Sequence, residues 1–166
     1  MHIVAHSMGN RILINALDRV ARKPLPKTAA ELREVVFAAP DVQTVTFTQF
    51  VNDYFQTLHK AFNRKSNVPS RFTLYACGDD TALGLSRFAN GVTRAGDARQ
   101  ELVVIPPLET IDVTDAIVST DRHSYFVSNS TVLTDLFGVL RGDPPIERPN
   151  MDPVLVAAGK YWTIRA

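Results

Sequence analysis

A short stretch near the start of the chain limits the folds that this sequence can adopt. From Ile3 to Gly9 it reads IVAHSMG, which is an apolar run followed by a turn that contains one serine. Apolar residues then recur at helical spacing from Ile12 to Val20. A strand, a tight turn with a serine and a helix make up a nucleophile elbow, in which the serine hydroxyl is held in the open. The alternative is an ordinary strand–turn–helix unit in which Ser7 has no special role.

Small residues flank Ser7 at a spacing typical of the elbow. The usual pattern is G-x-S-x-G, and this chain has Ala5 and Gly9 at the two outer positions. We expect small residues there because the strand and the helix should pass close together.

The bulk properties indicate one globular domain. The chain has 166 residues, of which 45% are hydrophobic and 21% are charged, with a formal net charge of +1. This balance offers no electrostatic basis for binding nucleic acid or an anionic membrane. The single cysteine, Cys77, excludes an internal disulfide. No run is apolar over the length of a bilayer and no signal peptide is visible, which leaves the location unknown and cytoplasmic by default.

Strand-like and helix-like segments alternate along the chain. Near-continuous apolar runs predict strands at 34–39, 72–76 and 110–113, the last of these closing the sheet, and an edge strand or extended segment at 102–105. Helical spacing predicts helices at 44–62, 81–89 and 124–140, and the aromatic face of the first is interpreted as core packing. The predicted fold class is α/β, with a parallel sheet and helices on both faces. Residues 1–141 form the domain, and the Pro-rich tail 142–166 is expected to be irregular.

Reactive groups in such sheets gather at the carboxyl ends of the strands. A serine nucleophile needs a histidine base, and the histidine needs an acid that orients it. Among four histidines, His123 alone follows a late strand and precedes the closing helix, which fits the order serine, acid, histidine. His2 and His6 lie in the elbow strand, and His59 lies within the aromatic helix.

The acid has three candidates at this stage. Asp79 and Asp80 follow the third strand, and Asp41 follows the second. One of Asp79 and Asp80 is also expected to cap the helix that follows.

Several ordered motifs resemble a known family. Besides the elbow HIVAHSMGNR, the chain has AAPD at 38–41, Tyr75 followed by DTAL at 80–83, NG and RAG at 90–96, IDV at 111–113 and HSYF at 123–126. Together these resemble the DUF900 family of bacterial α/β hydrolases of uncharacterised function, over about residues 2 to 140.

The resemblance implies a catalytic triad of Ser7, Asp80 and His123, and Asp80 is preferred over Asp79 by its spacing to the Ala82-Leu83 pair. The backbone N–H of Met8 would donate to the oxyanion. The implied activity is that of a serine hydrolase of esterase or lipase type, which acts on a small carboxylic ester or acyl substrate and needs no metal and no cofactor. A peptidase or thioesterase on the same fold is a weaker alternative.

Members of the family carry several strands before the elbow, so the resemblance implies that this chain is an incomplete domain that lacks the early strands. The elbow strand would then expose an apolar edge at Ile3 and Val4, which predicts self-association through that edge. A second oxyanion donor would also be absent. The alternative function is therefore a catalytically inactive or truncated hydrolase-like module that acts in binding or assembly.

Overall fold

The computed structural model describes residues 1–23, 31–62, 70–78, 80–99, 102–117 and 125–166. Helices and strands alternate along these ranges as far as β4, and two short 3₁₀ helices are also present. The elements are β1 (His2–His6), α1 (Gly9–Arg22), β2 (Glu34–Ala38), α2 (Thr44–Phe62), β3 (Arg71–Ala76), α3 (Thr81–Asn90), β4 (Glu109–Asp112), η1 (Thr114–Ala116), α4 (Tyr125–Ser128), α5 (Ser130–Arg141), η2 (Pro145–Glu147), β5 (Met151–Val156) and β6 (Gly159–Ile164).

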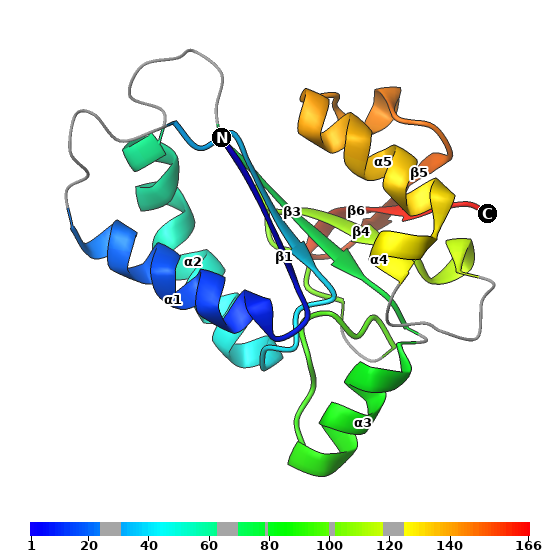
Figure 1. The fold of residues 1–166 in the computed structure, drawn as a ribbon, viewed down its shortest axis with the longest axis horizontal. Coiled ribbons are helices and arrows are strands. Elements are labelled where there is room, and N and C mark those ends of the chain that lie inside the picture. Colours follow the sequence, from blue (N-terminus) through cyan, green and yellow to red (C-terminus); the bar gives the residue numbers. More distant parts are fainter. Residues whose placement is uncertain (24–30, 63–69, 79, 100–101, 118–124) are drawn as a thin grey trace.

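The sheet has six strands in the order β1-β2-β3-β4-β6-β5 (Figure 1). All neighbouring strands are parallel except β5, which pairs with β6 in the antiparallel direction. Every residue of β2 is buried, as expected for a parallel strand that is covered on both faces. The predicted fold class, a parallel α/β sheet with flanking helices, is confirmed.

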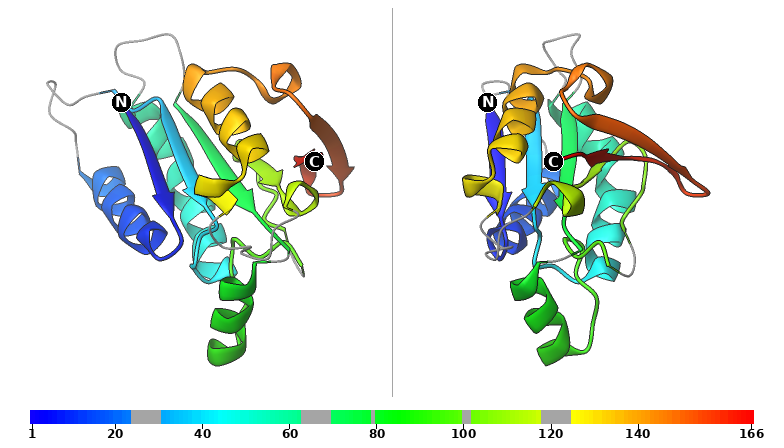
Figure 2. Two further views of the ribbon diagram at one scale, coloured as in Figure 1. Left: turned by 45° about the vertical axis from the view of Figure 1, so that its right-hand side comes forward. Right: turned by 90° about the vertical axis from the view of Figure 1, so that its right-hand side faces the viewer.

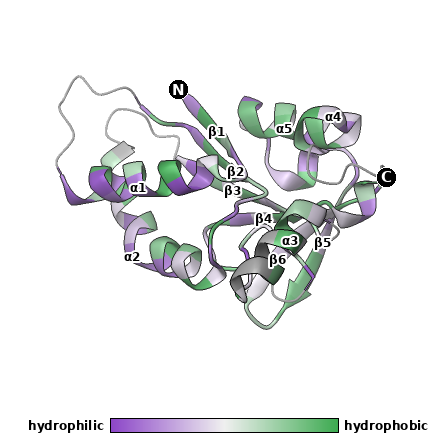
Figure 3. Cartoon of the chain, turned by 60° about the horizontal axis from the view of Figure 1, so that its bottom comes forward, coloured by the Kyte–Doolittle hydropathy of each residue, from purple (hydrophilic) through white to green (hydrophobic). Residues whose placement is uncertain are grey.

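Two layers of helices cover the sheet. Residues of α1 and α2 pack in one apolar cluster on one face, and residues of α4 and α5 pack in a second cluster on the other face. α3 projects beyond the carboxyl ends of the strands (Figures 1 and 2). Hydrophilic and hydrophobic residues alternate along α1, as its amphipathic pattern predicts (Figure 3).

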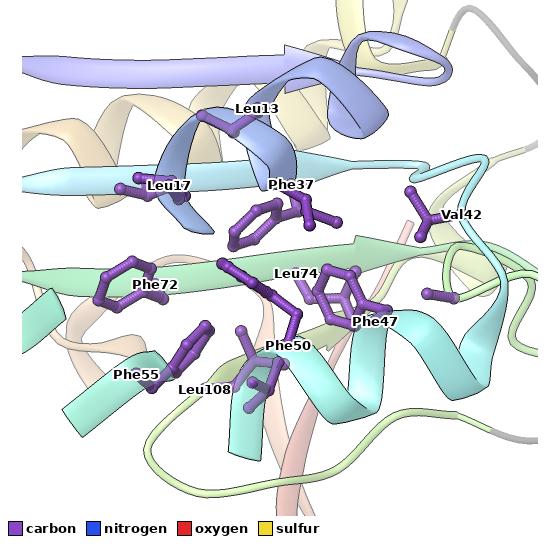
Figure 4. Close-up of a cluster of buried hydrophobic side chains, with 14 of the residues drawn as sticks. Leu13, Leu17, Phe37, Val42, Phe47, Phe50, Phe55, Phe72, Leu74 and Leu108 are labelled. Carbon is purple, nitrogen blue, oxygen red and sulfur yellow. The ribbon is translucent and has the colours of Figure 1, made fainter. Parts of the chain in front are cut away.

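The aromatic face of α2 lies in the core. Phe47, Phe50 and Phe55 are at most 4% exposed. The ring of Phe47 meets Phe37 of β2 edge-on at 5.2 Å, and Phe55 stacks on Phe72 of β3 at 4.4 Å. Figure 4 shows these side chains between α2 and the sheet. The interpretation of this face as core packing is confirmed.

The expectation of an irregular tail at 142–166 is wrong. β5 and β6 form a hairpin, and β6 joins the sheet beside β4 (Figure 2). Trp162 and Ile164 are buried against the second core cluster. Pro153 lies in the edge strand β5, opposite Trp162, and an edge strand tolerates the missing N–H. The predicted closing strand, which is β4, is therefore followed by two more.

The predicted helix at 124–140 is divided within the described residues. Asn129 has an extended backbone and separates α4 from α5, and its side chain accepts a hydrogen bond from the N–H of Val132 at 3.0 Å. Asparagine favours such a cap over a helix interior, which explains the break. Residues 102–105 belong to no strand, so the alternative of an edge strand there is wrong.

A buried ionic cluster joins the hairpin segment to the sheet and to α5. The Arg148 side chain is fully buried and contacts Asp135 of α5 at 3.3 Å and also Glu109 of β4. The hydroxyl of Tyr75 in β3 donates to Asp135 at 2.5 Å. Arg148, Asp135 and Tyr75 are buried and the Glu109 side chain is 14% exposed, so the cluster ties β3, β4 and α5 to the segment before β5.

Candidate active site

The backbone of Ser7 has the conformation of a nucleophile elbow. Ser7 lies between the end of β1 and the start of α1, with φ at +52°. The left-handed region costs a non-glycine residue about 1–2 kcal/mol, and strain of this kind is concentrated at functional sites. The Ser7 N–H donates to the carbonyl of Ala38 at 3.0 Å. The elbow predicted from the sequence is therefore present as backbone geometry.

Asn10 fixes this turn. Its side-chain Nδ2 donates to the carbonyls of Ser7 at 3.0 Å and Ala38 at 3.1 Å, so it links the elbow to the end of β2. Asn10 is completely buried. Its role was not predicted from the sequence. An amide side chain directly after the G of the elbow pattern is the signal that could have identified it.

The space around position 9 does not require a glycine, as far as the described residues show. A Cβ placed on Gly9 would have no other heavy atom within 4 Å, apart from its chain neighbours and its own helix. The expectation that a small residue is needed at this position for close approach is therefore wrong in this part of the chain.

Met8 directly follows Ser7 and occupies the N-cap position of α1 with a helical backbone, at φ −60° and ψ −23°. The first N–H groups of a helix have no acceptor within the helix. Its side chain is 62% exposed. The N–H of Met8 thus belongs to the helix N-terminus that adjoins the Ser7 side chain.

Asp80 lies at the carboxyl end of the sheet, past β3, and is fully buried. Its Oδ1 accepts a hydrogen bond from the N–H of Leu83 at 3.0 Å, which caps α3. The helix-capping role expected for one of the two aspartates therefore belongs to Asp80. This cap uses one of the two carboxylate oxygens.

Asp41, the other candidate acid, is held by two arginines. Its Oδ2 contacts Nη2 of Arg11 at 2.9 Å, and its Oδ1 lies 3.2 Å from Nε of Arg94. Its carbonyl also accepts from Nε of Arg11 at 2.7 Å. Both carboxylate oxygens are thus engaged with guanidinium groups beside the elbow.

Asp79 and His123 lie outside the described residues. The described residues resume at Tyr125, where α4 (Tyr125–Ser128) begins, and this helix contacts both β1 and β3. Phe126 of α4 stacks on the ring of His6, next to Ser7, with ring centroids 6.1 Å apart. Phe126 also packs edge-on against Tyr75 at 5.8 Å. α4 therefore lies against the elbow.

Tyr125 is the second residue that the sequence analysis did not single out. It is fully buried, and burial raises the pKa of its hydroxyl well above the usual value. Electrostatic interaction with the neighbouring Cys77, Asp80 and Asp112 raises this pKa further. The Tyr125 hydroxyl is therefore a neutral donor close to Asp80. Its position directly after the HS of the HSYF motif was the available signal.

The other histidines are placed as follows. His2 begins β1, and partial burial with the nearby N-terminal ammonium and Arg33 lowers its pKa. His6 packs on Phe126 as described above. The side chain of His59 is outside the described set.

Within the described ranges, no three His, Cys, Asp or Glu side chains are grouped so that they could hold a metal ion. No helix among these residues is long and apolar enough to cross a membrane.

Comparison with known proteins identifies a family. A family model described as an alpha/beta hydrolase of unknown function (DUF900) matches residues 1–139, which is most of the chain. No curated protein and no solved structure matches the chain significantly. The matched range includes the elbow, Asp80 and His123, and it ends within α5.

Proposed function

Since the chain belongs to this family of α/β hydrolases of unknown function, we propose that it is a serine hydrolase of esterase type that acts on a small carboxylic ester. The observation that carries the proposal is the left-handed backbone of Ser7 at the junction of β1 and α1. This strained conformation is uncommon for a serine, and a nucleophile at an elbow requires it.

In the proposed reaction, Ser7 Oγ attacks the ester carbonyl carbon while His123 accepts the hydroxyl proton. The N–H of Met8 donates to the oxyanion, and collapse of the tetrahedral intermediate releases the alcohol, which takes its proton from His123. Water then attacks the acyl-serine by the same route in reverse, with His123 again as base. Asp80 orients His123 and stabilises its charged form.

The packing of α4 supports the choice of His123. It precedes Tyr125 by two residues, a separation that an extended chain covers in about 7 Å. Tyr125 is close to Asp80, and Phe126 rests on His6 beside the elbow. The contact of α4 with the elbow strand supports a base from the HSYF motif that begins at His123.

The engagement of Asp41 supports the choice of Asp80 as the acid. Two guanidinium groups neutralise Asp41 and occupy both of its carboxylate oxygens. A carboxylate held in this way stabilises a histidinium less effectively than one paired with the histidine alone.

Hydrolysis of short p-nitrophenyl esters tests the proposal. We expect turnover by the wild-type chain, loss by several orders of magnitude in Ser7→Ala, and retention in Ser130→Ala, which removes an exposed serine at the start of α5. Equal turnover by Ser7→Ala and wild type would contradict it. A folded protein without turnover would favour the inactive binding module.

The acid is tested by Asp80→Asn. Asparagine also caps helices, so the bond from Leu83 N–H and the fold should survive. Loss of the negative charge beside the histidine should lower kcat by about 10⁴-fold. A variant of Asp80 with wild-type kcat would remove it from the triad.

A further inference from the structure

A pocket lies beside the elbow, between α1 and α2, and the proposed triad does not use it. Its volume is about 340 Å³, in the size range of small-molecule sites. It is lined by Arg11, Ile14, Asn15, Val42, Gln43, Thr46 and Arg94. These residues come from α1, from the turn between β2 and α2, from the first turn of α2 and from the loop after α3, so the pocket adjoins the carboxyl end of the sheet.

The pocket is close to Ser7. Arg11 follows Ser7 by four residues, which is about one turn or 6 Å of helix. Asp41, the partner of Arg11, donates its N–H to the carbonyl of Ser7 at 3.3 Å. A ligand in this pocket therefore lies next to the elbow.

The charges of the pocket are unbalanced in favour of cations. Arg11 and Arg94 share the single carboxylate of Asp41, which leaves one positive charge in excess. Arg94 is 3% exposed, and its Nε makes an ion pair with Asp41 but no hydrogen bond of good geometry. A buried guanidinium with an unsatisfied donor is costly, and an anionic ligand would remove that cost.

The backbone holds Arg94 firmly in this place. The N–H of Ala95 donates to the carbonyl of Val42 at 2.9 Å, and the N–H of Gly96 donates to that of Pro40 at 3.1 Å. A Cβ on Gly96 would come within 2.6 Å of the carbonyl carbon of Ala39, so only glycine allows the loop to approach so closely. The guanidinium is therefore positioned before any ligand binds.

The other lining groups can also contact a small anionic ligand. Asn15, Gln43 and Thr46 offer hydrogen bonds, and Ile14 and Val42 offer apolar contact. A second cavity of about 220 Å³ shares Ile14, Asn15 and Thr46 with the first and continues toward Phe50 and Tyr54. The two adjoining cavities thus have arginines at the end beside the elbow and space for the rest of a small molecule between α1 and α2.

We propose that this pocket binds the acid group, carboxylate or phosphate, of a small ligand through Arg11 and Arg94. Paired anionic oxygens match the guanidinium fork in geometry and charge. In the hydrolase proposed above, on which this part of the inference rests, the acid group belongs to the substrate, which is then an ester with a free acid group.

Binding is tested first, without any need for catalysis. Glutarate and inorganic phosphate are titrated separately into Ser7→Ala protein at constant ionic strength, with calorimetry as the readout. We expect saturable binding of at least one anion, and the two titrations identify which acid group is preferred. When Arg11→Met or Arg94→Met is combined with Ser7→Ala, the affinity for the anion should fall about tenfold or more. Arg19→Met, which removes an exposed charge from the same helix, should leave it unchanged.

Far-UV circular dichroism confirms that each variant is folded. Arg11 is half-exposed, so Arg11→Met gives a decisive result even if the buried Arg94 cannot be replaced. Absence of binding by the folded protein, or equal affinities in the Arg11→Met and Arg19→Met variants, would overturn the site.

The substrate class is tested by kinetics. The p-nitrophenyl monoester of glutaric acid is compared with p-nitrophenyl valerate in wild-type and Arg11→Met protein. We expect Arg11→Met to raise KM about tenfold for the acidic ester alone. An equal effect on both esters would overturn the assignment to the substrate. If neither ester is hydrolysed, the proposed function fails, and the binding titrations decide the site by themselves.

Discussion

At the scale of single residues, the elbow depends on two side chains with different tasks. Ser7 adopts a left-handed backbone that costs stability, and Asn10 holds that backbone through two carbonyl groups. The chain thus keeps a strained residue in place with a neighbour that is completely buried. The strain at Ser7 and the support from Asn10 can both be measured as changes in the free energy of unfolding, without an activity assay.

Ser7→Gly should be more stable than Ser7→Ala. Both lack the hydroxyl, but alanine keeps the Cβ that makes φ of +52° unfavourable, and glycine does not. We expect a difference of about 1 kcal/mol in the free energy of unfolding, measured with urea. Equal stabilities would mean that Ser7 is not strained.

Asn10→Ala should destabilise the chain by about 1–3 kcal/mol, because the carbonyls of Ser7 and Ala38 would lose a buried donor. The control is Asn15→Ala, an exposed site on the same helix, which should change the free energy of unfolding by less than about 0.5 kcal/mol. Similar losses in the two variants would contradict the role of Asn10.

At the scale of elements, the ionic cluster around Arg148 decides how the hairpin docks. Burial raises the pKa values of Asp135 and Glu109, while the charge of Arg148 lowers them. Since the folded-state pKa values remain above the unfolded ones, of about 4, these groups stabilise the fold most at low pH. Their contribution is lost as pH rises through the folded pKa.

Arg148→Met should therefore cost about 3–5 kcal/mol at neutral pH, because two buried carboxylates lose their partner. The loss should be smaller at mildly acidic pH, where both carboxyls can be protonated. Urea unfolding at the two pH values measures this. Arg165→Met breaks an exposed pair with Asp152 and should cost less than about 1 kcal/mol at either pH. A pH-independent loss in Arg148→Met would refute the cluster's electrostatic role.

At the scale of the whole molecule, β1 and β5 are the two edges of the described sheet. β1 pairs with β2 on one side, and Val4 on this strand is 41% exposed. Exposed apolar edge strands pair readily with other strands. Self-association through β1, as the sequence predicted, stays a prediction.

Val4→Lys should shift the protein toward monomer in sedimentation experiments over a wide concentration range, since an edge lysine opposes strand pairing. Leu155→Lys, on the opposite edge, is the matched control and should leave association unchanged. A monomeric wild type, or an effect of Leu155→Lys alone, would contradict association through β1.

The parallel sheet and the elbow could be predicted because local signals specified them. The apolar run of β2 and the aromatic spacing of α2 are local, and the serine turn was flanked by both periodicities. The β5–β6 hairpin could not be predicted in this way, because its prolines indicated irregular structure and only pairing with β4 makes Pro153 acceptable.

The candidate site also has parts that could be predicted from the sequence and parts that could not. Asp80 could be placed after β3 by chain order, but its cap of α3 and the two arginines on Asp41 are contacts between distant segments. The same holds for Arg94: the RAG motif marked a loop there, but the contact of Arg94 with Asp41 is formed only in the folded chain. The spacing of residues in the sequence does not reveal which charged side chains pair at the edge of the sheet.

The central claim is that Ser7 is an activated nucleophile. A fluorophosphonate probe labels only such a serine, and peptide mass spectrometry of the labelled wild-type chain locates the adduct. We predict one phosphonylated residue, Ser7, and no labelling of His123→Ala, in which the base is absent. An adduct on another serine, or a folded wild-type chain without an adduct, would contradict the claim.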